Sequence, residues 1–245
     1  MSLFQPPPPT AYDLVFNIFG IEVRVHPFFW LIAILFGASA GSPAAIAAWV
    51  VAMFVSILVH ELGHSMAMRY FGQDSRIVLH SFGGLAIPID SVGYGNGPRT
   101  PWHYIVISIA GPFAGLLLAS IIAVGVEQAG GFIVYRKLLN FFPYPIAHLP
   151  FEYTNGNIIV NYFLFINIFW GLINMMPVFP LDGGQMTREL FILFGRRNQI
   201  VNSLWLSVIT GGIIAILAVI FLQSFYMGFL FGYLAYQSYQ AIQFV

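Results

Sequence analysis

The chain has 245 residues, of which 59% are hydrophobic and only 7% are charged. Soluble domains carry about 25% charged residues, so this composition is that of a membrane protein surrounded by a lipid bilayer. Nine basic residues balance nine acidic ones, and no net charge points to a nucleic-acid partner. The absence of cysteine excludes disulfides, thiolate catalysis and cysteine metal ligands.

Residues 1–14 precede the first apolar element. The four prolines from Pro6 to Pro9 cannot begin a helix, so this segment is predicted to be a mobile, Pro-rich, extended tail. It lacks a basic region followed by an apolar one, and we therefore do not expect a secretory signal peptide here. Residues 15–25 are β-branched and aromatic around a central glycine, which predicts a short strand pair.

Six apolar segments follow, and each of the long ones reaches the roughly 20 residues that span a bilayer. They cover residues 27–40, 44–71, 104–126, 158–176, 201–222 and 225–243, the first being short for a full span. Residues 75–89 are too short and broken for a spanning helix, which predicts a β-hairpin or re-entrant element between the second and third helices. The predicted fold class is an all-α polytopic membrane protein with about six transmembrane helices and these two small β elements.

Basic residues are distributed unevenly between the loops of a six-span topology. The loops on the side of the N-terminus hold seven arginines, and the opposite loops hold only Arg136 and Lys137. The positive-inside rule then puts both termini of this multi-pass protein in the cytoplasm, most simply of a prokaryotic cell with the chain in its inner membrane. This prediction requires a short helix expected over 185–194 not to cross the membrane.

The run His60-Glu61-Leu62-Gly63-His64 lies near the end of the second apolar segment. H-E-x-x-H on a helix is a zinc-binding, hydrolytic signature. Residues four apart share one helix face, so His60 and His64 can reach one Zn²⁺, while Glu61 can act as the general base toward the attacking water. The alternative is a pair of core histidines with a capping glutamate. Three ionisable groups in one turn of a membrane helix are costly, which favours the functional interpretation.

A catalytic zinc takes three protein ligands and keeps a fourth position open. Asp182 follows the end of the fourth segment, on the same predicted side as His60, but it is equally suited to cap the helix over 185–194. His80 is another candidate, because its element could fold back into the bundle. The other histidines weighed as ligands are His26, His103 and His148. Spacing alone leaves the third ligand open.

A second motif makes the chain resemble a known family. Residues 174–183 read N-M-M-P-V-F-P-L-D-G. Together with the His60–His64 run they resemble the site-2 protease family of intramembrane metalloproteases, which pairs H-E-x-x-H on one transmembrane helix with N-x-x-P-x-x-x-L-D-G at the end of a later one. Every specified position matches, and Ala110-Gly111-Pro112 also looks like a family feature.

The resemblance implies roles for individual residues. Asp182 would be the third ligand of one catalytic Zn²⁺, beside His60 and His64. Asn174 would position substrate or stabilise the oxyanion, for which a side-chain amide donor is physically suited. The residues similar to the family's β element, thought to receive an unwound substrate as an added strand, are Phe82, Gly83 and Gly84. A plain tight turn is the alternative for these three.

The resemblance also implies an activity. The chain would be a zinc metalloendopeptidase that cleaves a membrane-anchored substrate in or near its transmembrane segment, close to the cytoplasmic face, in regulated intramembrane proteolysis. The expected partners are a transmembrane substrate, such as a membrane-tethered or anti-sigma-type regulator or a remnant signal peptide, and a regulatory protein. One protease domain would cover residues 15–245, with a catalytic core over about 44–195 and gating helices over about 201–243. Neither the PDZ domain nor the C-terminal regulatory domain of some family members is expected.

Three other functions compete with this hypothesis. A metal transporter needs acids and histidines spaced along a path through the membrane, whereas the ionisable residues here gather at one depth. A non-catalytic relative is disfavoured, because the set of His60, Glu61, His64 and Asp182 is complete. Another class of membrane H-E-x-x-H peptidase would use a glutamate as its third ligand, and Glu189 is the local rival to Asp182.

Overall fold

The computed structural model describes residues 6–81, 83–89, 100–138, 142–150, 154–195 and 197–244. The chain divides into two compact units. The first comprises Met1–Gly95 and Ala110–Gly171, and the second comprises Asn96–Ile109 and Leu172–Val245.

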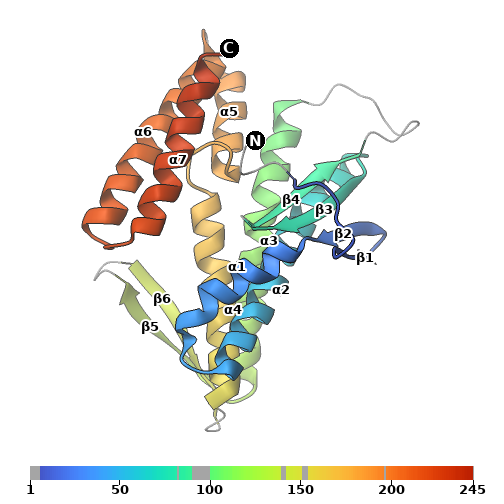
Figure 1. Ribbon diagram of the computed structural model, residues 1–245, viewed down its shortest axis with the longest axis vertical. Coiled ribbons are helices and arrows are strands. Elements are labelled where there is room, and N and C mark those ends of the chain that lie inside the picture. The colour runs from blue at the N-terminus through green and yellow to red at the C-terminus, as the bar shows by residue number, and fades with distance from the viewer. Residues whose placement is uncertain are drawn as a thin grey trace. The chain divides into compact units, whose positions relative to one another are not determined.

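A four-stranded sheet in the order β1-β2-β3-β4 belongs to the first unit (Figure 1). The predicted N-terminal strand pair is present as β1 (Leu14–Ile18) and β2 (Ile21–Val25), which run antiparallel. The predicted hairpin after the second helix is present as β3 (Ser75–His80) and β4 (Gly83–Pro88). β2 pairs in parallel with β3, so the two hairpins, which were expected as separate elements, form one sheet.

Helices α1 (Pro27–Gly37) and α2 (Pro43–Tyr70) each begin with a proline that follows a polar N-cap. The Nδ1 of His26 accepts from the backbone N–H of Phe28, and the Oγ of Ser42 accepts from that of Ala45, both at 3.2 Å. Proline has no N–H to leave unsatisfied in the first turn, which explains why both helices start at these positions.

The core of the first unit lies where the sheet packs against α1 and α2. One face of β2 is fully buried through Ile21, Val23 and Val25, as the two-residue alternation of a strand requires. The helices contribute Phe29 and Ile57 to the same cluster. This packing places β3 and β4 against the C-terminal half of α2, which carries the H-E-x-x-H run.

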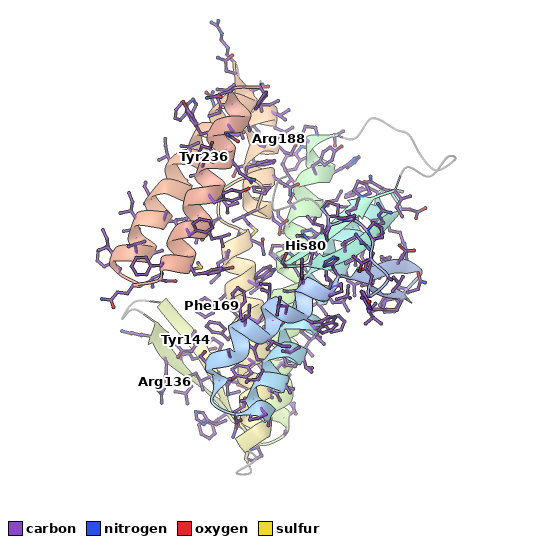
Figure 2. The ribbon with its side chains drawn as sticks, viewed as in Figure 1. His80, Arg136, Tyr144, Phe169, Arg188 and Tyr236 are labelled. Carbon is purple, nitrogen blue, oxygen red and sulfur yellow. The ribbon has the colours of Figure 1, made fainter. Side chains whose placement is uncertain are left out.

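A third hairpin, which the sequence did not predict, is formed by β5 (Phe132–Leu138) and β6 (Phe142–His148). Pro143 and Pro145 lie in β6, and prolines in a sequence argue against a strand, which is why this one was not predicted. They are two residues apart, so both lack an N–H on the same edge, and a two-stranded sheet leaves one edge of each strand unpaired. Helix α4 (Thr154–Asn174) supports the hairpin, and the rings of Tyr144 and Phe169 lie 6.3 Å apart (Figure 2).

The second unit contains α5 (Asp182–Phe194), α6 (Gln199–Ile220) and α7 (Phe225–Ile242), with α6 and α7 side by side (Figure 1). Serines on the two long helices hold the segment that leads into α5. The Oγ of Ser207 accepts from the N–H of Phe179 at 3.1 Å, and the Oγ of Ser238 donates to the carbonyl of Phe179 at 3.3 Å.

Four helices are long and apolar enough to cross a bilayer. They are Pro43–Tyr70, Pro101–Gln128 (the helix α3), Gly156–Asn174 and Gln199–Ile220. Within the described residues α1 is a shorter apolar helix, and α7 is not among the candidates. The chain is thus a mostly helical membrane protein, and four of the six predicted spans are supported by length and composition.

Candidate metal centre

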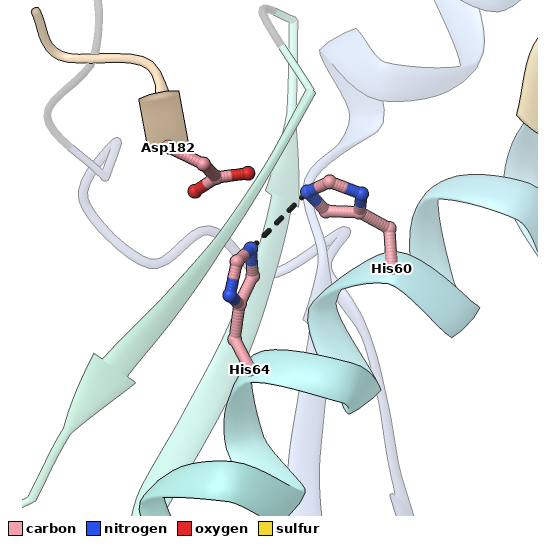
Figure 3. Close-up of side chains that lie close together, drawn as sticks. All are labelled: His60, His64 and Asp182. Carbon is pink, nitrogen blue, oxygen red and sulfur yellow. Dashed lines mark hydrogen bonds between the residues drawn. The ribbon is translucent and has the colours of Figure 1, made fainter. Parts of the chain in front are cut away.

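His60 and His64 form the centre of the candidate site. They lie one turn apart on α2, and their Nε2 atoms are 3.1 Å apart (Figure 3). Two nitrogen ligands of one tetrahedral zinc, each about 2.05 Å from the ion, are separated by about 3.3 Å. Both imidazoles are buried, with 3% and 6% of the residue exposed. Their donor atoms therefore converge as two ligands of a single ion would.

Helix α3 approaches α2 closely at this turn. A Cβ atom at Gly63 would lie 2.8 Å from the Cβ of Ala114, and one at Gly111 would lie 2.5 Å from the Cε1 of His64. Carbon atoms in favourable contact are about 3.5–4.0 Å apart. Only glycine fits at either position, and these small residues allow the two helices to approach closely.

The carboxyl group of Glu61 lies against the first residues of β4. A Cβ atom at Gly84 would be 2.6 Å from both the Cδ and an Oε of Glu61. The backbone of β4 therefore passes close to the carboxylate. β4 is also an edge strand of the described sheet, so one of its edges is open for pairing with another strand. Gly83 has a φ of +120°, and a Cβ there would meet Trp170 of α4. Phe82, predicted together with these glycines, lies outside the described residues.

Asp182 and Asn174 belong to the second unit. Asp182, drawn in Figure 3, is the first residue of α5, and the N-cap of that helix is Leu181. Leu181 offers no side-chain hydrogen bond to the helix, and Asp182 is the acidic residue of its first turn. A Cβ at Gly183 would lie 2.5 Å from the carbonyl oxygen of Met176, so the first turn of α5 winds tightly against the chain that precedes it. Asn174 is the last residue of α4 and is partly buried.

The structure gives the alternative ligands other surroundings. His26 caps α1 through its Nδ1. The ring of His148 stacks on Phe132 with centroids 5.0 Å apart. Glu189 on α5 has an Oε 3.4 Å from the Nε of Arg188 (Figure 2), a charge partner that competes with a metal.

His80, the candidate hardest to dismiss from the sequence, is a buried residue of β3 whose register partner is Gly83 (Figure 2). Burial, together with the nearby His26 and Arg24, lowers the pKa of His80 to about 4. The imidazole is therefore neutral near pH 7.

One buried polar residue near the site was missed. Asn167 on α4 donates a hydrogen bond to Ser56 of α2 at 2.8 Å. Its signal in the sequence was an amide in the middle of an apolar segment, where polar side chains tend to be functional.

Apolar helices of membrane-spanning length and a buried His-Glu-x-x-His turn define an integral membrane protein with a metal-binding helix. Residues 48–220 match the model of peptidase family M50, and the chain belongs to this family. The resemblance to site-2 proteases drawn from the two motifs is thereby confirmed.

Individual relatives agree with this assignment. The chain is 27% identical over 179 residues to zinc metalloprotease MJ0392 of Methanocaldococcus jannaschii, a match that covers 72% of this chain and 44% of the relative. It is 26% identical over 178 residues to stage IV sporulation protein FB of Bacillus subtilis, covering 72% and 49%. The chain thus spans about half the length of these curated relatives.

A solved structure is similar in fold. The site-2 protease from Methanocaldococcus jannaschii matches with a TM-score of 0.56 and 21% sequence identity, over 94% of each chain.

Proposed function

We propose that the chain is an intramembrane zinc metalloprotease that hydrolyses a peptide bond in or near a transmembrane segment of a membrane-anchored substrate, close to the cytoplasmic face. The observation that carries this proposal is the convergence of the His60 and His64 Nε2 atoms, 3.1 Å apart, with Glu61 buried beside them. Membership of peptidase family M50 and the similarity to a named zinc metalloprotease support both the metal and the reaction.

His60, His64 and Asp182 are the proposed ligands of one zinc ion. Among the described residues these three form the group of histidines and acids suited to hold a metal. Two imidazoles and one carboxylate are a common donor set for a catalytic zinc, and they leave one position open for substrate and water. Zinc held there would polarise the scissile carbonyl and make water more acidic.

Glu61 is the proposed general base. Its carboxylate takes a proton from the attacking water and then delivers that proton to the leaving amine. Asn174 is proposed to donate its amide N–H to the oxygen of the scissile carbonyl as negative charge develops there.

The substrate is proposed to bind as a strand added to the edge of β4. Gly83 and Gly84 carry no side chains, and the backbone of Gly84 lies against Glu61, so a peptide paired with this edge would pass close to the base. A transmembrane helix has its carbonyls hydrogen-bonded and must first unwind, which helix-breaking residues near the cleaved bond would favour.

The excess of arginines on one side supports cytoplasmic termini in a prokaryotic inner membrane. Candidate substrates are membrane-tethered regulators and remnant signal peptides, with a separate protein regulating access. α6 and α7 are proposed to gate the site within one protease domain.

The test is a Glu61→Gln variant of the purified chain in detergent, assayed on a membrane-anchored substrate with a fluorogenic cleavage site. We expect at least about a 100-fold loss of rate, because a positioned base contributes about 10²–10⁴-fold, with the zinc content unchanged. Glu127→Gln, at an exposed position near the end of α3, is the matched control. Cleavage by Glu61→Gln at the parent rate would refute the assignment. Zinc flux without proteolysis by the parent chain would indicate a transporter instead.

A further inference from the structure

Asn167 is a buried amide inside an apolar helix, with 2% of the residue exposed. Its Nδ2 donates to the Oγ of Ser56 on α2 and to the carbonyl of Phe163 on its own helix, both at 2.8 Å. Its Oδ1 is buried without a hydrogen-bond partner among the described residues. A leucine of similar size would avoid the cost of that unsatisfied oxygen, so packing alone does not explain an asparagine here.

The location of this amide relates it to the metal-binding turn. Ser56 precedes His60 by one helical turn on α2. On α3, Gly115 follows Gly111 by one turn, and a Cβ at Gly115 would be 3.3 Å from the Oδ1 of Asn167. Asn167 therefore lies where α2, α3 and α4 meet, one layer away from the histidines.

We propose that Asn167 is a positioning residue that sets the rotation of α2, and with it the direction of the His60 imidazole. Apolar contacts between membrane helices tolerate small rotations, whereas a hydrogen bond between helices selects one arrangement. The ring nitrogen of a histidine lies about 6–7 Å from the helix axis, so a rotation of about 10° moves it by about 1 Å. Metal–ligand distances hold to within about 0.2 Å, so such a rotation matters for zinc and hardly at all for packing.

The inference rests on the proposed function, since it assumes that His60 binds zinc. The experiment compares Asn167→Leu with the parent chain in detergent, measuring zinc affinity by chelator competition and coordination geometry from the visible spectrum of the Co²⁺ form. We expect zinc affinity to fall about three- to twenty-fold, the range of hydrogen bonds between membrane helices, and the Co²⁺ bands to change. Ser56→Ala should act in the same direction. The double variant should bind zinc no more weakly than Asn167→Leu alone, because both changes remove the same hydrogen bond between Asn167 and Ser56.

Asn161→Leu is the control on the same helix. The Asn161 amide exchanges two hydrogen bonds with the backbone of Ala147 at 2.9 Å, so its loss should lower thermal stability and leave zinc affinity unchanged. Parent-like zinc affinity and Co²⁺ bands in Asn167→Leu would overturn the proposal. If that variant does not fold, Ser56→Ala decides the question alone. Parent zinc binding that survives His60→Ala would instead overturn the proposed ligand set, and this inference with it.

Discussion

Gly84→Ala should disable the proposed base while leaving the fold and the metal in place. The added Cβ would lie closest to the Cγ of Glu61 and 2.6 Å from its Cδ and one Oε, where about 3.5–4.0 Å is favourable. The two groups must therefore separate by about 1 Å. Gly84 does not have a positive φ, so alanine brings no backbone strain of its own.

The Glu61 side chain, from its Cγ outward, rotates more easily than β4 moves, because β4 is held by its pairing with β3. Stability should therefore change little. A misplacement of about 1 Å at a reacting group costs about 100-fold in rate, and this is the expected loss of kcat.

The assay measures cleavage of the membrane-anchored substrate, zinc content and thermal unfolding on the same preparation. Gly125→Ala on α3 is the matched control, because nothing lies within 4 Å of a Cβ at that position. Cleavage by Gly84→Ala within about twofold of the parent rate, at full zinc content, would show that Glu61 is not constrained by β4 in the way the structure indicates.

In Gly111→Ala the new Cβ would lie 2.5 Å from the Cε1 of His64, so zinc affinity by chelator competition should fall about 10- to 100-fold, as for other disturbed ligand supports, and an unchanged affinity would contradict this. Burial raises the pKa of Asp13, but hydrogen bonds from Thr10 and Arg24 outweigh it and lower that pKa to about 2. The carboxylate therefore stabilises the fold above its unfolded pKa near 3.8, and this stabilisation is lost as the pH falls through about 2. The difference in melting temperature between the parent and Asp13→Asn should shrink from pH 5 to pH 2, and a constant difference would argue against the ion pair.

The helices were largely predictable from the sequence. Segments expected over 44–71 and 201–222 correspond to α2 at Pro43–Tyr70 and α6 at Gln199–Ile220. Long apolar runs bounded by prolines and polar caps are local signals, and they do not depend on the path of the rest of the chain. The prolines of β6 gave the opposite signal, and that strand was missed for this reason.

The candidate site was also predictable in part, because some of its signals are local to one helix. The spacing of His60 and His64 puts two donors on one helix face whatever the helix packs against, so the sequence by itself identified the proposed ligand pair and the proposed base beside it. That Asp182 is the first residue of α5, and not a residue of the loop before a helix over 185–194, required the observed start of that helix.

Only the tertiary structure revealed what surrounds that pair. Three contacts join residues that are between 23 and 111 positions apart in the sequence. They are Gly84 with Glu61, Gly111 with His64, and Asn167 with Ser56. Such contacts depend on how β4, α3 and α4 pack against α2. The periodicity of a single segment carries no information about this packing. The sequence by itself identified the groups that are proposed to do the chemistry, and the packing of these elements decided how closely each group is held.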